Sequence, residues 1–502
     1  MINLNTNLAP TDTLYYNNQK YKVSLVLCNS DGSIFPLSTA NLVNLQIVDD
    51  GLLWYKTGSI VIRNPDNIIE KRPSAEVSVN ANYVFRNDGR DILIVKIIPV
   101  LDEEIPSVDL AAELYNLEFV FVIYEKNDIP TGDSTKDRLL QLNFWELDYQ
   151  IFYETNIDWS KNYVLPANSQ LYLLSDEERK VPTGLAIKNL IKYVLGDDTI
   201  FTQNWDEGSS KIFYNSLANN NAIDDLNYLL FRHTGKKTGG VQDGDPCLLL
   251  RNRYTKVWSL LSFNSIFSDA LKGRTEAGPL HIEKFILAGN ADSGNNTIPT
   301  LPQSPTSSSQ IIYSSEINSV INNYQFEDIS PDTNVNFFIN YPCYSNNLKD
   351  KKFVVDFTDN TAESVKNYIQ KTYIDKLSVN AAAALTLNNT KKNINIVKQA
   401  YSYQNEKVSR FADSRNILIK SMLFLNQALV FTVPGATLRR TNTFIGIDRN
   451  QNTIINNFDN KLLGQWFTNK IIHNFTDKEY TTTVFAVKPH TNDRMPISDN
   501  VG

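Results

Sequence analysis

The chain has 502 residues, of which 42% are hydrophobic, and this is too much apolar material for a disordered chain. No run of about 18 apolar residues is present, so we expect no transmembrane helix. The net charge of −7 excludes the broad basic surface that specific nucleic-acid binding requires. The first residues, MINLNTNLAPTD, lack a basic segment followed by an apolar one, so we expect no cleaved secretion signal.

The first domain that the sequence predicts covers residues 1–165 and consists mainly of strands. Apolar residues alternate at Tyr21, Val23, Leu25 and Leu27, and polar turns separate this run from the following ones. The Asp88–Gly89 step favours a tight turn, and residues 125–136 are expected to form a polar loop. At least six strands without βαβ alternation predict a barrel or sandwich. Asp49, Asp50 and Glu70 lack the spacing of a metal loop, and we interpret them as turn residues.

The pattern changes to a small α+β module in residues 166–287. A helical stripe begins at Thr183, a possible N-cap, and is expected to stop at Gly196. A second helix is expected to end at Gly235, and strands are predicted at 247–251 and 256–260. The apolar face of the second helix contains Ile223, Leu226, Leu229 and Leu230.

The remaining chain is predicted to contain a linker, a mixed region and a second β domain. Residues 288–310 are rich in Gly, Asn, Pro and Ser, which is typical of a linker or long surface loop. Residues 311–410 form a mixed α/β region with one helix predicted near 361–378. Strands are expected from 411 onwards, although 416–427 fits a helix as well. Residues 462–489 predict a β-hairpin with its turn at 476–479.

The sequence offers no recognisable catalytic, cofactor or metal motif. The three cysteines, Cys28, Cys247 and Cys343, are far apart, which predicts free thiols and neither a disulfide framework nor a zinc site. His233, His281 and His490 have no second histidine or cysteine at ligand spacing, and no GxSxG or phosphate loop is present.

Two further features have ordinary structural interpretations. The acidic pairs at 177–178 and 224–225 are expected by chance among 55 acidic residues. His473 lies in a predicted strand among aromatic residues, where a structural role fits better than catalysis because catalysis needs a second positioned group. We therefore predict no catalytic, cofactor-binding or metal-binding residues and no enzymatic activity.

The last 90 or so residues carry an ordered set of motifs. "LVFTVPGATLRRTNTFIGIDRNQN" reads as strand, turn and strand, and "LLGQWFTNKIIHNFTDKEYTTTVFAVKP" as a strand opening with glycine, a turn and a strand. This region resembles the closing part of bacteriophage baseplate hub proteins and their contractile-injection relatives. The matching positions are Pro434, Gly435, Gly464, Trp466, His473, Phe475, Tyr480, Thr481 and Thr482.

The α+β module between two β domains also resembles that family, through "KIFYNSLANNNAIDDLNYLLFRHT" and "LLLRNRYTKVWSLLSF". Two departures stand out. The family usually has a Gly-Asp pair after the Pro-Gly turn, whereas this chain has "RRTNTFIGID", and residues 286–410 are additional length.

The resemblance implies a mainly β chain, α+β overall, with two β-barrel tube-type domains, the inserted module and the extra mixed region. It implies a virion protein assembled in the host cytoplasm, acting as a homotrimeric adaptor between a sixfold tail tube and a threefold central spike. Its partners would be the tube protein, the spike and other baseplate proteins, while DNA passes through the lumen without specific binding. Two alternatives remain: another baseplate or tail-tip structural protein, and a tail-associated peptidoglycan hydrolase with its catalytic domain in residues 286–410.

Overall fold

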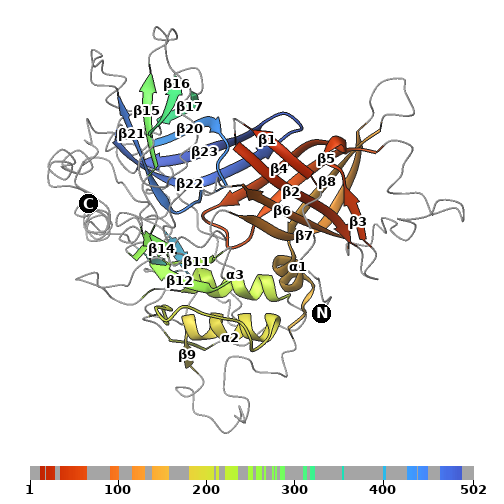
Figure 1. Ribbon diagram of the computed structural model, residues 1–502. Coiled ribbons are helices and arrows are strands. Elements are labelled where there is room, and N and C mark those ends of the chain that lie inside the picture. Colours follow the sequence, from red (N-terminus) through yellow and green to blue (C-terminus); the bar gives the residue numbers. More distant parts are fainter. Residues whose placement is uncertain are drawn as a thin grey trace, which may run out of the picture.

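The computed structural model is dominated by strands, which form one large curled sheet with a helical module beside it (Figure 1). This confirms the mainly β fold class. The structure describes residues 12–16, 19–28, 34–64, 91–100, 116–129, 138–157, 180–208, 211–213, 221–233, 235, 247–252, 256–262, 265–266, 274–275, 278–279, 283–288, 309–313, 317–322, 353–355, 400–402, 427–437, 439–449 and 464–488.

The first β body contains eight antiparallel strands from the N-terminal third of the chain. Their order in the sheet is β1-β2-β6-β7-β8-β5-β4, with β3 paired to β2. The strands are β1 Asp12–Tyr16, β2 Gln19–Cys28, β3 Ile34–Leu37, β4 Leu42–Asp50, β5 Thr57–Arg63, β6 Ile92–Pro99, β7 Leu117–Ile129 and β8 Leu139–Glu146, with a 3-10 turn at Thr39–Asn41.

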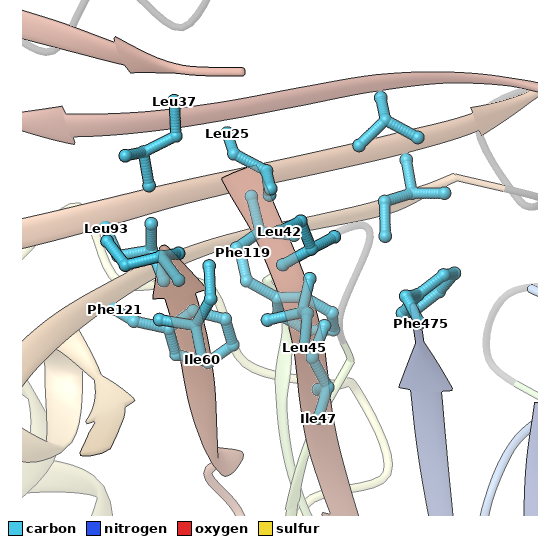
Figure 2. Close-up of a cluster of buried hydrophobic side chains, with 14 of the residues drawn as sticks. Leu25, Leu37, Leu42, Leu45, Ile47, Ile60, Leu93, Phe119, Phe121 and Phe475 are labelled. Atoms are coloured by element: carbon cyan, nitrogen blue, oxygen red, sulfur yellow. The ribbon is translucent and has the colours of Figure 1, made fainter. Parts of the chain in front are cut away.

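The core of this body is formed by side chains at every second position of the strands. In β8, Leu140, Leu142 and Phe144 are buried, whereas their neighbours on the other face are half-buried. Figure 2 shows side chains such as Leu25 and Leu45 filling the inside of the curl, together with Phe475 from the far end of the chain. Two C-terminal residues, Phe475 and Tyr480, are therefore part of the N-terminal core.

The second β body consists of C-terminal strands and three strands from the middle of the chain. These are β15 Glu283–Ala288, β16 Ser309–Tyr313, β17 Ile317–Asn322, β20 Gln427–Pro434, β21 Thr443–Arg449, β22 Gly464–Phe475 and β23 Tyr480–Lys488. β15 runs parallel to both β16 and β21, and β17 runs antiparallel to β20. A separate core forms around Trp466 and Phe431.

β22 belongs to both β bodies. Its first half, from Gly464 to Thr468, pairs with β21, and its second half, from Lys470 to Phe475, pairs with β4. β23 pairs along β22, with a register shift between Thr468 and Lys470 where the neighbour changes. The two predicted β domains are thus joined into one sheet by a shared strand.

Among the described residues, three helices and four short strands form the module beside the first β body, and it includes α1, which precedes the predicted module at 166–287 (Figure 1). Its elements are α1 Leu147–Glu154, β9 Lys180–Pro182, α2 Thr183–Leu195, β10 Lys211–Phe213, α3 Ala222–Arg232, β11 Cys247–Arg251 and β12 Trp258–Ser262. Leu190, Leu226 and Trp258 are part of its core, which also receives Trp54 from the loop between β4 and β5. Two further strand pairs are β13 Arg274–Thr275 with β14 Gly278–Pro279, and β18 Phe353–Val355 with β19 Ala400–Ser402.

The helices and the hairpin confirm the predicted patterns, with several corrections at their ends. Thr183 is the first residue of α2 and not its cap, because Pro182 occupies the cap position without a side-chain bond. Gly196 ends α2 with φ of +105°. α3 ends at Arg232, three residues before the predicted Gly235, with His233 as its C-cap, and is capped at its start by Asn221, whose side chain accepts from the Asp224 N–H.

Two strand limits also differ from the predictions. β7 continues to Ile129, into the polar segment predicted as a loop, because it keeps pairing with β8. β12 begins at Trp258 and not at Lys256, since Lys256 has φ of +57° and lies in the turn. The predicted turn at 88–89 and the helix at 361–378 lie outside the described residues. Of the alternative helix at 416–427, only Gln427 is described, and it begins β20. The domain limits stay predictions.

Candidate functional site: the C-terminal hairpin and the β4–β5 loop

The C-terminal hairpin, formed by β22, the turn at 476–479 and β23, carries most of the residues of the family motif. Phe475 ends β22 and Tyr480 begins β23, and their rings stack with centroids 4.0 Å apart. His473 Nδ1 and the Tyr480 hydroxyl are hydrogen-bonded at 2.8 Å. His473 and Tyr480 are 1% and 0% exposed, so this imidazole lies in a packed interior and not at a surface.

Gly435 completes the packing around Tyr480 from the turn that follows β20. Its N–H donates to the Tyr480 carbonyl oxygen at 2.8 Å. A Cβ atom on residue 435 would lie 2.3–2.4 Å from three carbons of the Tyr480 ring, which is far inside van der Waals contact. Glycine is required here because the backbone approaches an aromatic face. The Pro-Gly turn and the Tyr-Thr-Thr strand of the motif are therefore in direct contact.

Two tyrosines of the first β body close the other side of this cluster. The Tyr16 hydroxyl donates to the Thr476 carbonyl oxygen at 2.7 Å. The Tyr21 and Tyr480 rings meet edge to face with centroids 5.6 Å apart. Burial raises the pKa of both Tyr16 and Tyr21 above the ordinary value, and Asp477 adds to the effect at Tyr16. The hairpin turn is thus bound to β1 and β2, about 460 residues away in sequence.

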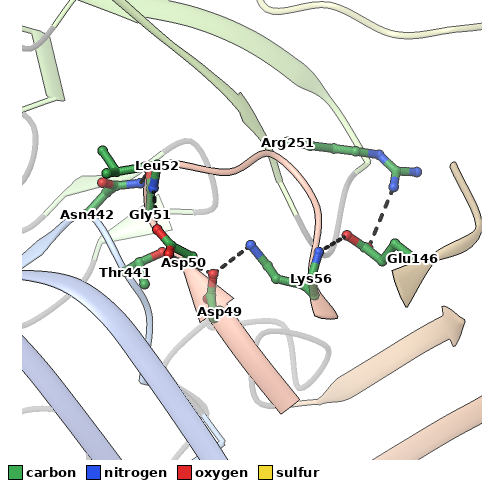
Figure 3. A network of polar contacts seen from close by, with 9 residues as sticks. All are labelled: Asp49, Asp50, Gly51, Leu52, Lys56, Glu146, Arg251, Thr441 and Asn442. Carbon is green, nitrogen blue, oxygen red and sulfur yellow. Dashed lines mark hydrogen bonds and ion pairs between the residues drawn. The ribbon is translucent and has the colours of Figure 1, made fainter. Parts of the chain in front are cut away.

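The loop between β4 and β5 forms a second junction, shown in Figure 3. The Asp49 carboxylate and the Lys56 ammonium form an ion pair at 2.6 Å, with both side chains less than 10% exposed. Thr441 donates from its hydroxyl to Asp49 Oδ1 at 3.2 Å. Asn442 donates from Nδ2 to the Gly51 carbonyl oxygen at 3.2 Å. These contacts fasten the loop to the segment that leads into β21 of the second β body.

The same loop is fastened to the module from its other end. Glu146, the last residue of β8, accepts the Lys56 backbone N–H at 2.7 Å. Arg251 on β11 lies 3.7 Å from the other Glu146 carboxylate oxygen, pairs with Asp148 and covers the Trp258 ring at 5.5 Å. Three parts of the chain therefore meet at one charged network, and this is where their relative placement is fixed.

The acidic residues named in the sequence analysis lie in separate parts of the fold. Asp49 and Asp50 lie at the end of β4, and Asp50 accepts the Leu52 N–H at 3.0 Å, as turn residues do. Asp224 and Asp225 lie in the first turn of α3, where their charge suits the helix dipole. The positions 70, 177–178, 281, 343 and 490 lie outside the described residues. Lys56 and Arg251, which link the three parts, were missed because a single charge in a loop or strand gives no pattern.

The fold also brings together three residues that sequence spacing kept apart. Asp206, His233 and Cys247 each offer one ligand atom, and these atoms lie within 4.8 Å of one another. They come from the loop after α2, the end of α3 and the start of β11. The prediction of no metal ligands rested on sequence spacing alone. Sequence spacing cannot reveal a cluster whose members come together only in the folded chain.

The comparisons with known proteins give only distant similarities. No family model matches the chain, and no curated protein matches it. Among solved structures, a 43 kDa prophage tail protein from Shewanella oneidensis is 9% identical with a TM-score of 0.42, covering 94% of this chain and 99% of that one. A tail protein from Neisseria meningitidis is 9% identical with a TM-score of 0.41, covering 93% and 96%.

A type VI secretion component from E. coli is 8% identical with a TM-score of 0.35, covering 90% of this chain and 76% of that one. Its description gives it structural similarity to the phage T4 tail proteins gp27 and gp5. Likeness at these values is too weak to support a function, so the proposal below rests on the residues of this chain. Among the described helices, none is long and apolar enough to span a membrane.

Proposed function

We propose that this chain is a structural protein of a phage tail, specifically a baseplate hub. The observation that carries the proposal is the convergence of the motif residues on one ring. Gly435, His473 and Phe475 all contact Tyr480, although they come from different strands and turns. Contacts of this kind between motif residues stabilise one local structure. Here that structure is the hairpin that joins the two β bodies.

The polar groups of the site are used for structural contacts. His473 is buried beside Tyr480, and the carboxylates of Asp49, Glu146 and Asp148 are held by cations or backbone N–H groups. A general acid or base must reach a substrate within hydrogen-bonding distance. Side chains buried in this way do not present such a group, which supports a role other than catalysis for the hairpin and the junction.

The two β bodies suggest how the subunits assemble. They have separate cores and lie side by side because β22 runs through both. Three copies around a threefold axis place six β bodies in a ring, which suits an adaptor between a sixfold tail tube and a threefold central spike. The partners of the proposed hub are therefore a second and third copy of the chain, the tube protein, the spike and other baseplate proteins.

The outer face of the hairpin is a candidate for the contact between subunits. Ile471, His473 and Phe475 are buried toward the first core, whereas Ile472 and Asn474 alternate with them and are half-buried on the opposite face. On β23, Thr483 and Phe485 lie on that outer face, with Lys470 over the Phe485 ring at 5.5 Å. An aliphatic and aromatic strip rimmed by polar groups has the composition of an interface.

The net charge of −7 supports a channel through which DNA slides. Like charges keep a polyanion from adhering to the wall. A reconstructed ring whose lumen is lined mainly by lysine and arginine would contradict this part of the proposal.

The test is the mass and shape of the full chain in solution. We expect light scattering to give three times 57.0 kDa at high concentration, and negative-stain images to show threefold rings. Ile472→Glu should shift the mass toward the monomer without changing the circular dichroism spectrum. Ile200→Glu is the matched control, because Ile200 is 60% exposed and belongs to the module and not to the hairpin.

A chain that stays monomeric at all concentrations and forms no rings would contradict the hub proposal. A zymogram on peptidoglycan addresses the hydrolase alternative: a lytic band from the pure chain would contradict a purely structural role.

A further inference from the structure

We propose that Asp206, His233 and Cys247 form a zinc-binding site within the α+β module. One ligand atom from each residue lies within 4.8 Å of the other two. Thiolate, imidazole and carboxylate are the three protein ligands that Zn²⁺ prefers, whereas Mg²⁺ and Ca²⁺ are bound almost entirely by oxygen atoms. The chemistry of the donor set therefore points to zinc or a similar transition-metal ion.

Binding of a tetrahedral ion requires the three ligand atoms, which lie within 4.8 Å of one another, to move closer together. Zn–S bonds of about 2.3 Å and Zn–N or Zn–O bonds of about 2.0–2.2 Å place neighbouring ligand atoms about 3.4–3.6 Å apart. His233 Nε2 and Asp206 Oδ1 are separated by 3.8 Å. Side-chain rotation of a few tenths of an ångström brings this pair to the required separation. Three protein ligands leave the fourth position of the ion for a water molecule.

Neighbouring groups orient two of the three ligands as in known metal sites. His233 Nδ1 lies 2.9 Å from the Thr183 hydroxyl, so Nε2 is the ring nitrogen on the side of Asp206. When Nδ1–H donates to this hydroxyl, the tautomer is the one that leaves Nε2 as the metal ligand. The Gly208 N–H donates to Asp206 Oδ1 at 2.7 Å and holds that carboxylate in place.

The backbone around the three ligands is tightly packed, and this packing holds the ligands in place. The Gly184 N–H donates to the Glu207 carbonyl oxygen at 3.0 Å, and a Cβ on Gly184 would lie 2.0 Å from the Asp206 carbonyl oxygen. Trp205 donates from Nε1 to the Gly184 carbonyl oxygen at 2.9 Å. The start of α2 is thus pressed against the 205–207 segment, and His233 and Cys247 are 4% and 7% exposed.

An ion at this position would connect three elements of the module. Asp206 lies in the loop after α2, His233 is the C-cap of α3 and Cys247 begins β11, so the three ligands come from different elements. Metal ligation between distant segments stabilises a small module in the way that a structural zinc does in other domains. The expected effect of binding is therefore a more stable module.

The first experiment uses cobalt as a spectroscopic probe on the full chain freed of metal by a chelator. Binding of Co²⁺ through Cys247 should produce a thiolate-to-cobalt charge-transfer band in the near ultraviolet with one equivalent of metal. Zn²⁺ should displace the cobalt and remove the band. Absence of any charge-transfer band in the wild-type chain would overturn the proposal, and the cluster would then be a buried His–Asp pair beside a thiol.

Variants assign the sulfur ligand. Cys247→Ser should abolish the band and weaken zinc binding at least tenfold, measured by competition with a chromophoric chelator. Cys28→Ser is the matched control, because Cys28 is also a buried cysteine but lies in the first β body. All variants are made on a Cys343→Ser background, since that position lies outside the described residues. Retention of the band in Cys247→Ser would overturn the proposal.

A measurement on the unmutated chain covers the case in which Cys247→Ser fails to fold. Zinc should slow alkylation of Cys247 at least tenfold, as followed by mass spectrometry of the peptide that contains it, while alkylation of Cys28 stays unchanged. Equal alkylation rates of Cys247 with and without zinc would contradict the assignment.

Discussion

Replacement of Gly435 by alanine tests the packing on which the proposed function rests. The added Cβ would lie 2.3–2.4 Å from three ring carbons of Tyr480. The ring has no easy escape, because it is 0% exposed, stacks on Phe475 and is hydrogen-bonded to His473. Overpacking of this kind costs about 1–3 kcal/mol, and we expect the upper end, about 3 kcal/mol, because the ring is held on two sides.

The loss of stability should be confined to the strands around residue 435, so hydrogen exchange followed by mass spectrometry is the suitable assay. A loss of about 3 kcal/mol in local opening free energy speeds amide exchange on the order of 100-fold. We expect this increase in peptides from β20, β22 and β23, the three strands that surround the contact.

Gly196→Ala serves as the matched control. No atom lies within 4 Å of a Cβ on Gly196, so its cost of about 1–3 kcal/mol comes from the backbone conformation alone and falls on the module. If Gly435→Ala leaves exchange in β20 and β23 at the wild-type rate, the close approach to Tyr480 is wrong, and with it the reason for a glycine in the motif.

Three further predictions concern the same contacts. Lys56→Met should lower the free energy of unfolding by about 3 kcal/mol, because it leaves the buried Asp49 carboxylate without this ion pair. Adding Asp49→Asn to the same chain should restore about half of the lost thermal stability. A Lys56→Met variant as stable as wild type would refute this. Tyr480→Phe should cost about 1–2 kcal/mol through the lost hydrogen bond to His473, seen as faster exchange in β22 and β23, whereas unchanged exchange would argue against the bond. Tyr21 has its pKa raised in the fold by burial, so the native chain keeps a proton that the unfolded chain loses above about pH 10. Its contribution is fully present below that pH and then falls by about 1.4 kcal/mol per pH unit, and Tyr21→Phe should flatten this decline in urea midpoints measured across alkaline pH.

The sequence predicted those parts of the fold that depend on local periodicity. Alternation in β2, the stripes of α2 and α3 and the C-terminal hairpin all appear where the pattern placed them. Element ends were less accurate, because caps and turns depend on single contacts. α3 ends at Arg232 and is followed by His233, whose side chain is hydrogen-bonded to Thr183 of α2, and no local sequence pattern encodes that contact.

The site was predictable only in part, for a physical reason. The motif identified Gly435, His473 and Tyr480 as members of one set, but their mutual contact requires strands paired in three dimensions. The share of β22 that pairs with β4 joins residues more than 400 positions apart, and such pairing leaves no periodic trace in either segment. Lys56 and Arg251 acquire their roles entirely through this long-range arrangement.

The continuity of β22 has a mechanical consequence. Its 12 residues span about 40 Å and are hydrogen-bonded to the first β body at one end and to the second at the other. A pull that separates the two bodies along this strand loads its ladder bonds in shear, so that many must break together. Force applied to one β body is therefore transmitted to the other through β22 with little extension.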